Sequence, residues 1–482
     1  MLKKEAFMKK LIIITMLGVL ATSLLTADGG VEFSGNIETL WGIGAPWTDS
    51  DKNAGRFTLG TTNFTGKLDA YYGNSSAYAE ATFSYDATGA LNGTEGSGNL
   101  GKGFDLSLGE LWLDYTESFW GVRIGRQKAA WGKADGIDIT NVLCPSDMSS
   151  LAAMTGDDSK LAVDAVRLSL SGNQFTADAY WIPFFTPAAL PLDQGNSLRK
   201  FIVPASVDFP IPAMNTSLSL PVTIGTLEKP GFGVWNSEFG LRVSGYLSAF
   251  DLSLYGFYGW DDTPFLDYSI SYGAPAVPGN PATAMPNGLF VSGKYERMAM
   301  VGADAALPIG ETVIRLEGAF FPQRHFQKKA EKIMEEKITE ATKAAANGTS
   351  PAEIKTSEKR NQLSALAGID WMPSGWTLTA QYYCDVVFGE LDTLDRKDAY
   401  QHGATLSLSK SLVNETLELS FSGLLGFNDF DSMLSPSVEY SLSDQINVGL
   451  KAFIFIPGPD RDGKYGAYKD LSSICLNAKF SF

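Results

Sequence analysis

The sequence predicts an all-β protein: a transmembrane antiparallel up-and-down β-barrel of about 18 strands, with 16 as the alternative. Three observations lead to this prediction. Apolar and polar residues alternate with a period of two along many segments, each roughly ten residues long. The links between these segments alternate between short and long. Beyond the amino-terminal segment, no apolar run is long enough for a membrane-spanning helix, so only a closed barrel could satisfy the backbone in lipid.

Composition limits the classes of protein that the chain could be. Of 482 residues, 44% are apolar and 19% are charged, and the 29 phenylalanines exclude a disordered chain. The formal net charge of −16 argues against a nucleic-acid partner, because no basic patch is large enough to release many counterions. The three cysteines, Cys144, Cys384 and Cys475, are odd in number and far apart, so they predict neither a disulfide framework nor a zinc site.

The amino terminus predicts a signal peptide over residues 1–27. Four lysines precede an apolar run of about fifteen residues, which is shorter than the roughly twenty needed to span a bilayer. Thr26 and Ala27 offer a cleavage point before Asp28. Residues 28–482 are then expected to form one barrel domain, since barrels run long as single domains.

The first predicted strand illustrates the pattern, because Val31, Phe33 and Ile37 alternate with Glu32, Ser34 and Glu38. The same alternation recurs along the chain. The predicted segments begin near Val31, Phe64, Ala77, Phe104, Trp120, Leu161, Gln174, Glu238, Phe250, Met298, Thr312, Gln362, Trp376, His402, Leu417, Leu434, Ile446 and Ile474.

The links sort by length. Short links are expected at 73–76, 116–119, 171–173, 308–310, 372–375 and 443–444, and long links at 42–61, 87–103, 127–160, 183–237, 261–295, 322–361, 390–400 and 457–472. Short periplasmic turns and long external loops are typical of outer-membrane barrels. Six tryptophans fall at strand ends, where the membrane interface would lie: Trp41, Trp120, Trp181, Trp260, Trp371 and Trp376.

One long link carries a helical pattern. Between residues 323 and 345, apolar residues recur at helical spacing among lysines and glutamates. This pattern predicts a helix in the external loop 322–361. The helix could serve as a lid or a partner contact, or it could be a solvated helix packed on the rim.

Polar positions of the predicted strands should line a water-filled lumen. The candidates are Glu38, Lys67, Asp69, Glu80, Asp114, Arg167, Arg242, Arg315 and Glu317. Such residues can set the ion preference of a pore, and the acidic surplus favours cations. Alternatively, opposite charges pair across neighbouring strands and select nothing.

The link 127–160 is the predicted constriction, because a loop this long in a sheet protein is usually functional or disordered. Its Gly125-Arg126-Gln127, Trp131-Gly132, Asp135, Val142, Pro145 and Asp147 resemble the signature of a porin-like family of uncharacterised outer-membrane barrels, and more distantly that of alginate-export barrels. Asn141 and Cys144 depart from that pattern. The resemblance implies that the loop folds inward and that the constriction is formed by Arg123, Arg126, Lys128, Lys133, Asp135 and Asp138. The alternative is a rim loop held by Trp131.

Catalytic, metal and cofactor sites are not predicted. The two histidines, His325 and His402, have no evident triad partners in sequence. The acidic clusters at 49–53 and 460–463 resemble calcium loops but lack the distant glutamate, so solvated turns explain them better.

The expected function is therefore a porin: a passive diffusion channel for small hydrophilic solutes in the outer membrane of a diderm bacterium. One alternative is a substrate-selective uptake channel for a sugar, an organic acid or a lipid. Another is a surface-displayed adhesin or recognition barrel without an open pore. The expected partners are outer-membrane lipid and small hydrophilic solutes, and the sequence leaves open whether copies assemble into a homo-oligomer.

Overall fold

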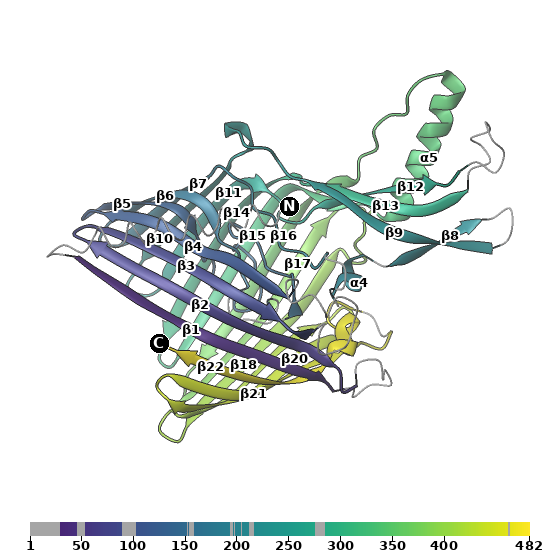
Figure 1. Cartoon of the computed structure of the whole chain (residues 1–482). Helices are drawn as coiled ribbons and strands as arrows, with labels where there is room; N and C mark the ends of the chain where they lie inside the picture. The colour runs from purple at the N-terminus through teal and green to yellow at the C-terminus, as the bar shows by residue number, and fades with distance from the viewer. Residues whose placement is uncertain are drawn as a thin grey trace.

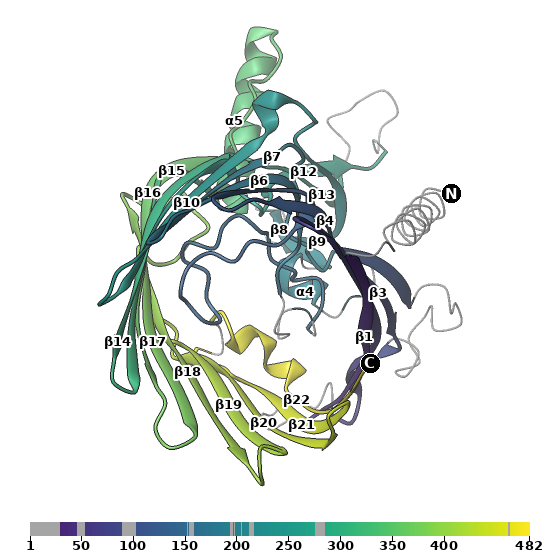
Figure 2. The ribbon, with the colours of Figure 1, turned by 90° about the vertical axis from the view of Figure 1, so that its left-hand side faces the viewer.

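Eighteen strands form a closed antiparallel barrel, which confirms the predicted fold (Figures 1 and 2). The computed structural model describes residues 29–45, 54–88, 103–151, 153, 159–192, 196, 198–203, 205–211, 216–274, 285–460 and 463–482. The last strand pairs with the first, from Asn36 opposite Ser481 to Gly44 opposite Ser473. Closure gives each barrel strand a neighbour on both sides, as a bilayer requires.

Each barrel strand pairs with its neighbour in the chain, once the strands outside the barrel are set aside. The barrel strands are β1 (Gly29–Gly44), β2 (Phe57–Tyr72), β3 (Ser75–Asp86), β4 (Phe104–Thr116), β5 (Trp120–Gln127), β6 (Val163–Ser171), β7 (Phe175–Ile182), β10 (Glu238–Tyr246), β11 (Asp251–Trp260), β14 (Arg297–Ile309), β15 (Thr312–Gln327), β16 (Ser357–Trp371), β17 (Trp376–Phe388), β18 (Tyr400–Leu412), β19 (Leu417–Gly426), β20 (Asp431–Ser443), β21 (Ile446–Ile456) and β22 (Ser473–Ser481). Every predicted segment corresponds to one of these strands.

The polarity of the barrel is inverted relative to a soluble protein. Large apolar side chains such as Phe33, Leu113 and Val301 are exposed on the outer face. Polar side chains such as Asp304 and Gln381 are buried inside. Exposed apolar surface of this extent would be unstable in water, and it fits a barrel whose outer face contacts lipid.

The predicted tryptophans form two groups at opposite ends of the strands. Trp120, Trp371 and Trp376 lie next to short turns, and Trp41, Trp181 and Trp260 lie near the long loops. Amphipathic indole rings settle at the two interfaces of a bilayer. The barrel wall between the two groups is therefore the membrane-spanning part.

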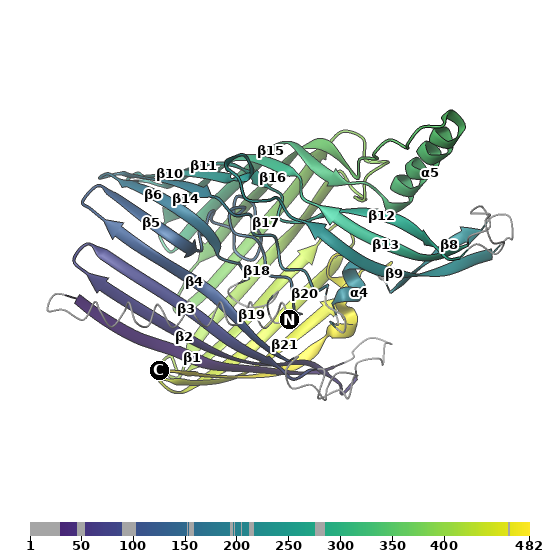
Figure 3. The ribbon, with the colours of Figure 1, turned by 45° about the horizontal axis from the view of Figure 1, so that its top comes forward.

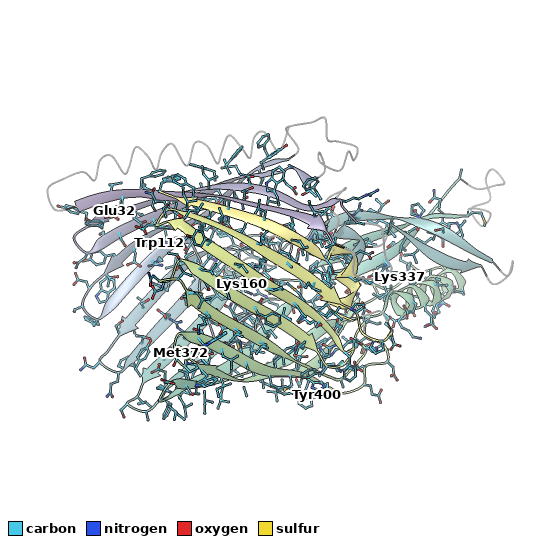
Figure 4. All side chains as sticks on the ribbon, turned by 90° about the horizontal axis from the view of Figure 1, so that it is seen from below. Glu32, Trp112, Lys160, Lys337, Met372 and Tyr400 are labelled. Atoms are coloured by element: carbon cyan, nitrogen blue, oxygen red, sulfur yellow. The ribbon has the colours of Figure 1, made fainter. Side chains whose placement is uncertain are left out.

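Short and long links lie at opposite ends of the barrel, here called the short-turn end and the long-loop end. In Figure 4, Glu32 and Met372 lie toward the short-turn end, and Tyr400 and Lys337 lie toward the other. One link breaks the alternation, since only residues 427–430 join β19 and β20 at the long-loop end.

A second, four-stranded sheet extends beyond the long-loop end (Figures 1 and 3). Its strands are β8 (Ser206–Ile211), β9 (Thr216–Glu228), β12 (Phe265–Tyr272) and β13 (Pro286–Lys294), in the order β12-β13-β9-β8. The sequence analysis treated both contributing links, 183–237 and 261–295, as loops. This sheet was missed because two separate links each supply one hairpin, and β9 and β13 pair in parallel only after the barrel brings them together.

The predicted helix exists as α5 (Ala330–Asn347), but it begins later than expected. β15 continues to Gln327 and β16 begins at Ser357, so the loop is 328–356 instead of 322–361. α5 packs against β12, where Lys337 Nζ lies 2.6 Å from Asp267 Oδ1. Among the described residues, no helix combines the length and apolar character needed to cross a bilayer.

The outer face of the wall should not tolerate charge. Leu254, midway along β11, is 54% exposed, and Leu254→Arg should destabilise the barrel by about 2–4 kcal/mol because it places a guanidinium in hydrocarbon. Unfolding by guanidinium in phospholipid vesicles measures this loss. The matched control is Ile338→Arg on α5, which is 52% exposed but lies outside the barrel. Equal effects of the two substitutions would contradict a lipid-facing wall.

Candidate functional site

The loop joining β5 and β6, residues 128–162, lies inside the barrel (Figure 2). We call it the first arm. Its apolar side chains Trp131, Ile139 and Leu143 are buried in one core with inward-facing side chains of the wall, among them Tyr255 and Met300. The arm is therefore packed against the inner wall as a core element.

One buried carboxylate fixes the first arm to the wall. Glu317 of β15 is 4% exposed and accepts four hydrogen bonds from the arm. Its Oε2 accepts from Lys133 N at 2.6 Å and Ala134 N at 2.9 Å, and its Oε1 accepts from Thr140 N at 2.8 Å and Thr140 Oγ1 at 2.7 Å. Burying this side chain is tolerable because donors occupy both of its oxygens.

Other wall residues hold the same segment of the arm. Arg315 Nη1 donates to Lys133 O at 2.9 Å and to Asp135 Oδ2 at 2.7 Å. Gln381 accepts from Asp135 N at 3.1 Å and donates to Asp135 O at 3.2 Å. Arg242 Nη1 donates to Ala130 O at 3.3 Å. These contacts come from β10, β15 and β17, so the arm crosses a wide section of the wall.

Glycines permit this close approach. Gly132 has φ +86°, a left-handed conformation that other residues rarely adopt, and a Cβ there would lie 2.4 Å from Glu317 Oε1. On the wall, a Cβ at Gly240 would lie 2.7 Å from Leu143 Cδ1, and one at Gly302 would lie 2.7 Å from Thr140 Cγ2. The wall thus lacks side chains where the arm needs room.

Among the described residues of the first arm, the exposed charged side chains are those of Asp135 and Asp138. Asp135 pairs with Arg315, as described above, and Asp138 Oδ2 lies 2.6 Å from Lys160 Nζ. Lys160 lies within the outline of the barrel in Figure 4. Lys133 is half-buried, and Lys128 N donates to Glu110 Oε1 at 2.7 Å. These predicted residues line the inward-folded loop, and their role in a constriction stays a prediction.

A second inward segment comes from residues 457–472, which we call the second arm. It contains the 3-10 helix η5 (Gly466–Leu471) and is anchored by Asp431 of β20, whose Oδ2 accepts from Tyr465 N at 2.5 Å and Gly466 N at 3.0 Å. In Figure 2 it lies inside the ring of strands. The sequence analysis did not foresee this arm.

Three loops meet in one core beside β21. Leu151 of the first arm, Leu198 next to α4 (Arg199–Ile202), and Leu471 of the second arm are buried together with Phe453 and Phe455. A sequence signal for this contact existed, because residues 452–456 form an unbroken apolar run instead of alternating. Such a run is typical of a strand covered on both faces.

Burial shifts the pKa values of titratable groups in both arms. Burial lowers the pKa of Lys464 in the second arm, although the carboxylates of Asp431, Asp385 and Asp138 act in the opposite direction. Asp138 belongs to the first arm, which shares the core beside β21 with the second arm. Burial raises the pKa of Cys144 to about 11, and its Sγ accepts from Ala129 N at 3.2 Å. The thiol is therefore a packing group without nucleophilic character.

Two arginines predicted at the constriction lie elsewhere. Arg126 lies two residues after Ile124, so both side chains are on the outer face of β5. Arg126 forms two hydrogen bonds to Asp164, with distances of 3.1 and 3.2 Å. The prediction failed because the period of two turns residue 126 outward. Arg123 faces inward, but it lies on the wall, with Nε 2.9 Å from Asp114 Oδ2.

The residues predicted to line the lumen fall into three settings. Arg242, Arg315 and Glu317 contact the first arm, as described above. Arg167 and Asp114 form an ion pair at 3.6 Å, and Lys67 and Glu80 form one at 3.7 Å. Glu38 and Asp69 remain exposed on the inner face of β1 and β2.

The family of the chain follows from a sequence comparison. The family described as "Protein of unknown function (DUF1302)" matches residues 45–441. The chain belongs to this family. No curated protein matches it.

Several solved structures resemble the chain over nearly its whole length. OccAB1 of Acinetobacter baumannii is 8% identical, with 95% of this chain and 96% of that chain covered and a TM-score of 0.48. OccK9 (OpdG) of Pseudomonas aeruginosa is 7% identical, with 94% and 97% covered and a TM-score of 0.48. The outer membrane channel DcaP of Acinetobacter baumannii is 9% identical, with 95% and 98% covered and a TM-score of 0.41.

One histidine has partners that the sequence did not reveal. His325 lies at the end of β15, where its Nδ1 is 2.8 Å from Ser357 Oγ and its Nε2 is 3.7 Å from Glu296 Oε2. The second distance is too long for a hydrogen bond, and Ser357 is buried and closed to a substrate. The part of the chain that the structure describes brings together no group of three side chains that could hold a metal ion.

Glu317 should control the position of the first arm. Glu317→Ala leaves four donors without an acceptor, each costing about 1–3 kcal/mol when buried. A loss of only about 1.4 kcal/mol raises the open population of the arm about tenfold. We expect faster trypsin cleavage after Lys133 in the folded barrel, with Glu317→Gln intermediate because its amide keeps one acceptor.

The control for this experiment is Glu38→Gln, which changes an exposed glutamate of the inner wall. Its cleavage rate should match that of the unchanged protein. Equal cleavage rates for Glu317→Ala and the unchanged protein would show that the other wall contacts suffice to hold the arm.

Proposed function

We propose that this barrel is an outer-membrane porin, a passive diffusion channel for small hydrophilic solutes. The observation that carries the proposal is the first arm, which is folded into the barrel and fixed to its inner wall by Glu317. A loop held in this way narrows the lumen without depending on a partner. It also places Asp135 and Asp138, both exposed, inside the barrel. Charged side chains at a narrowing are the usual means of sorting solutes in a pore.

The wall that the arms leave uncovered supports an aqueous lumen. Glu32 and Glu38 of β1 and Asp69 of β2 are exposed on the inner face, and none of them forms an ion pair with another described residue. Ionised carboxylates in these positions require water around them. This acidic face is the basis for proposing a preference for cations.

Location in the outer membrane of a diderm bacterium is part of the proposal. An expected signal peptide over residues 1–27 would direct export, and a closed barrel with two tryptophan groups suits that membrane. Enzymatic activity is not part of the proposal.

A second candidate function is recognition by the external sheet. A cavity of about 500 Å³ lies between β9, β12, β13 and α5, and its lining includes Asp267, Lys294 and Lys337. These charges are largely paired with one another or with neighbours.

Conductance distinguishes the alternative functions. A barrel used only for display would not conduct, whereas a substrate-selective channel would be blocked by one solute.

The position of the constriction can be tested by chemical block. Asp138→Cys, treated with a charged methanethiosulfonate reagent during planar-bilayer recording, should show a stepwise fall in conductance because added bulk lies in the narrowing. The variant is made with Cys384→Ser, because Cys384 is partly exposed, whereas the native Cys144 and Cys475 are buried and should not react.

The matched control for the block is Arg126→Cys, which places the thiol on the outer face of β5. It should leave conductance unchanged after the same treatment. Absence of any conductance from the unmodified protein would reject the porin, and an unblocked Asp138→Cys channel would reject the first arm as its constriction.

The acidic wall should set the ion preference. The triple variant Glu32→Gln, Glu38→Gln and Asp69→Asn removes three exposed charges, so the reversal potential in a salt gradient should shift toward anions. The charge-balanced control is Lys67→Gln with Glu80→Gln, which removes an existing ion pair and leaves the net charge unchanged. A similar shift in both variants would exclude the uncovered wall as the selectivity determinant.

A further inference from the structure

The segment between β9 and β10 carries an unusual group of exposed apolar side chains. Phe232 is 73% exposed, Val234 67% and Trp235 93%, and Phe232 stacks on Phe184 with ring centroids 5.1 Å apart. We call residues 231–237 the aromatic finger. Figures 1 and 2 show this segment standing outside the ring of barrel strands. It therefore faces away from the lumen.

The backbone of the finger is held in place. Arg297 of β14 donates to the carbonyl oxygens of Ser237, at 3.0 Å, and of Trp235. The indole N–H of Trp260 donates to Asn236 O at 2.9 Å, and Asn236 Nδ2 donates to Gly231 O at 2.7 Å. Exposed apolar side chains on a fixed backbone indicate a contact surface, because loops that only face water rarely expose a group of large apolar side chains.

The finger continues the lipid-facing wall. β10 begins two residues after Asn236, and its outward-facing Phe239 and Leu241 are exposed apolar side chains of the barrel. Trp260, which binds the finger, belongs to the tryptophan group at the long-loop end. The finger is thus at the level where the wall meets the membrane interface.

We propose that the aromatic finger inserts into the interfacial region of the lipid leaflet at the long-loop end. Its sequence from Gly231 to Asn236 contains no charged residue, and the side chains that it exposes include an indole and a phenyl ring. Aromatic rings of this kind favour the boundary between headgroups and acyl chains. Lipid is the occupant that the continuity with the outer wall favours over a second copy of the chain. The proposal needs only membrane embedding, so it does not depend on conduction.

The proposal can be tested with a nitroxide at residue 235. The mature chain carrying Trp235→Cys and Cys384→Ser is reconstituted in phosphatidylcholine vesicles, and relaxation by oxygen and by a water-soluble nickel complex is compared. Leu241→Cys on the outer wall and Ile338→Cys on α5 serve as lipid and water references. We expect the oxygen-to-nickel ratio at residue 235 to exceed that at 338 and approach that at 241.

A ratio at residue 235 equal to that at 338 would overturn the proposal. Spin–spin broadening that disappears on dilution with unlabelled protein would also overturn it, in favour of a second copy as occupant. Intrinsic fluorescence gives a check on a conservative variant: brominated lipids should quench the emission that Trp235→Phe removes. If that emission is insensitive to brominated lipids, the finger lies in water.

Discussion

The arrangement of the lumen depends on one buried carboxylate. Glu317 receives three backbone N–H groups and one hydroxyl from the first arm, so it satisfies donors that would otherwise be buried without partners. The described residues of 128–162 contain no regular strand of their own beyond isolated bridges, so they have no internal strand pairing to define the path of the loop. Hydrogen bonds from the wall fix the path of the loop instead. Gly132 makes room for Glu317, because a side chain at residue 132 would occupy the space of the carboxylate.

The same constraint explains why strands of one barrel differ in their inner faces. β1 and β2 carry Glu38 and Lys67 inward, which suits contact with water. β11 and β14 carry Tyr255, Phe257 and Met300 inward, where they pack on the first arm. The outer faces of all these strands remain apolar, since lipid lies outside them everywhere. The side chains on the inner face of a strand therefore depend on whether water or an arm contacts that face. The side chains on the outer face are apolar in all four strands.

The sequence predicts the strands well because their period is local. Each of the eighteen predicted segments overlaps one barrel strand, although β2 begins at Phe57, before the predicted Phe64, and the predicted helix lies within 328–356. The family resemblance assigned Arg126 to the constriction, but the period of two places it on the same outer face as Ile124, where it pairs with Asp164. The external sheet, the second arm and the aromatic finger escaped prediction for a different reason. Each depends on residues far apart in the sequence that become neighbours only after the barrel closes, as with Phe201 of α4 and Tyr468 of η5, whose rings lie 4.6 Å apart.

The distribution of paired and unpaired charge assigns different roles to the two sides of the lumen. The first arm carries Asp135 beside Arg315 and Asp138 beside Lys160, so most of its exposed charge is balanced within hydrogen-bond distance. The uncovered wall carries Glu32, Glu38 and Asp69 without such partners among the described residues. A balanced pair acts at short range, whereas an unbalanced group acts over roughly a Debye length, about 8–10 Å in physiological salt. In the proposed channel, the arm therefore sets the width of the passage, and the opposite wall supplies most of the unpaired charge among the described residues.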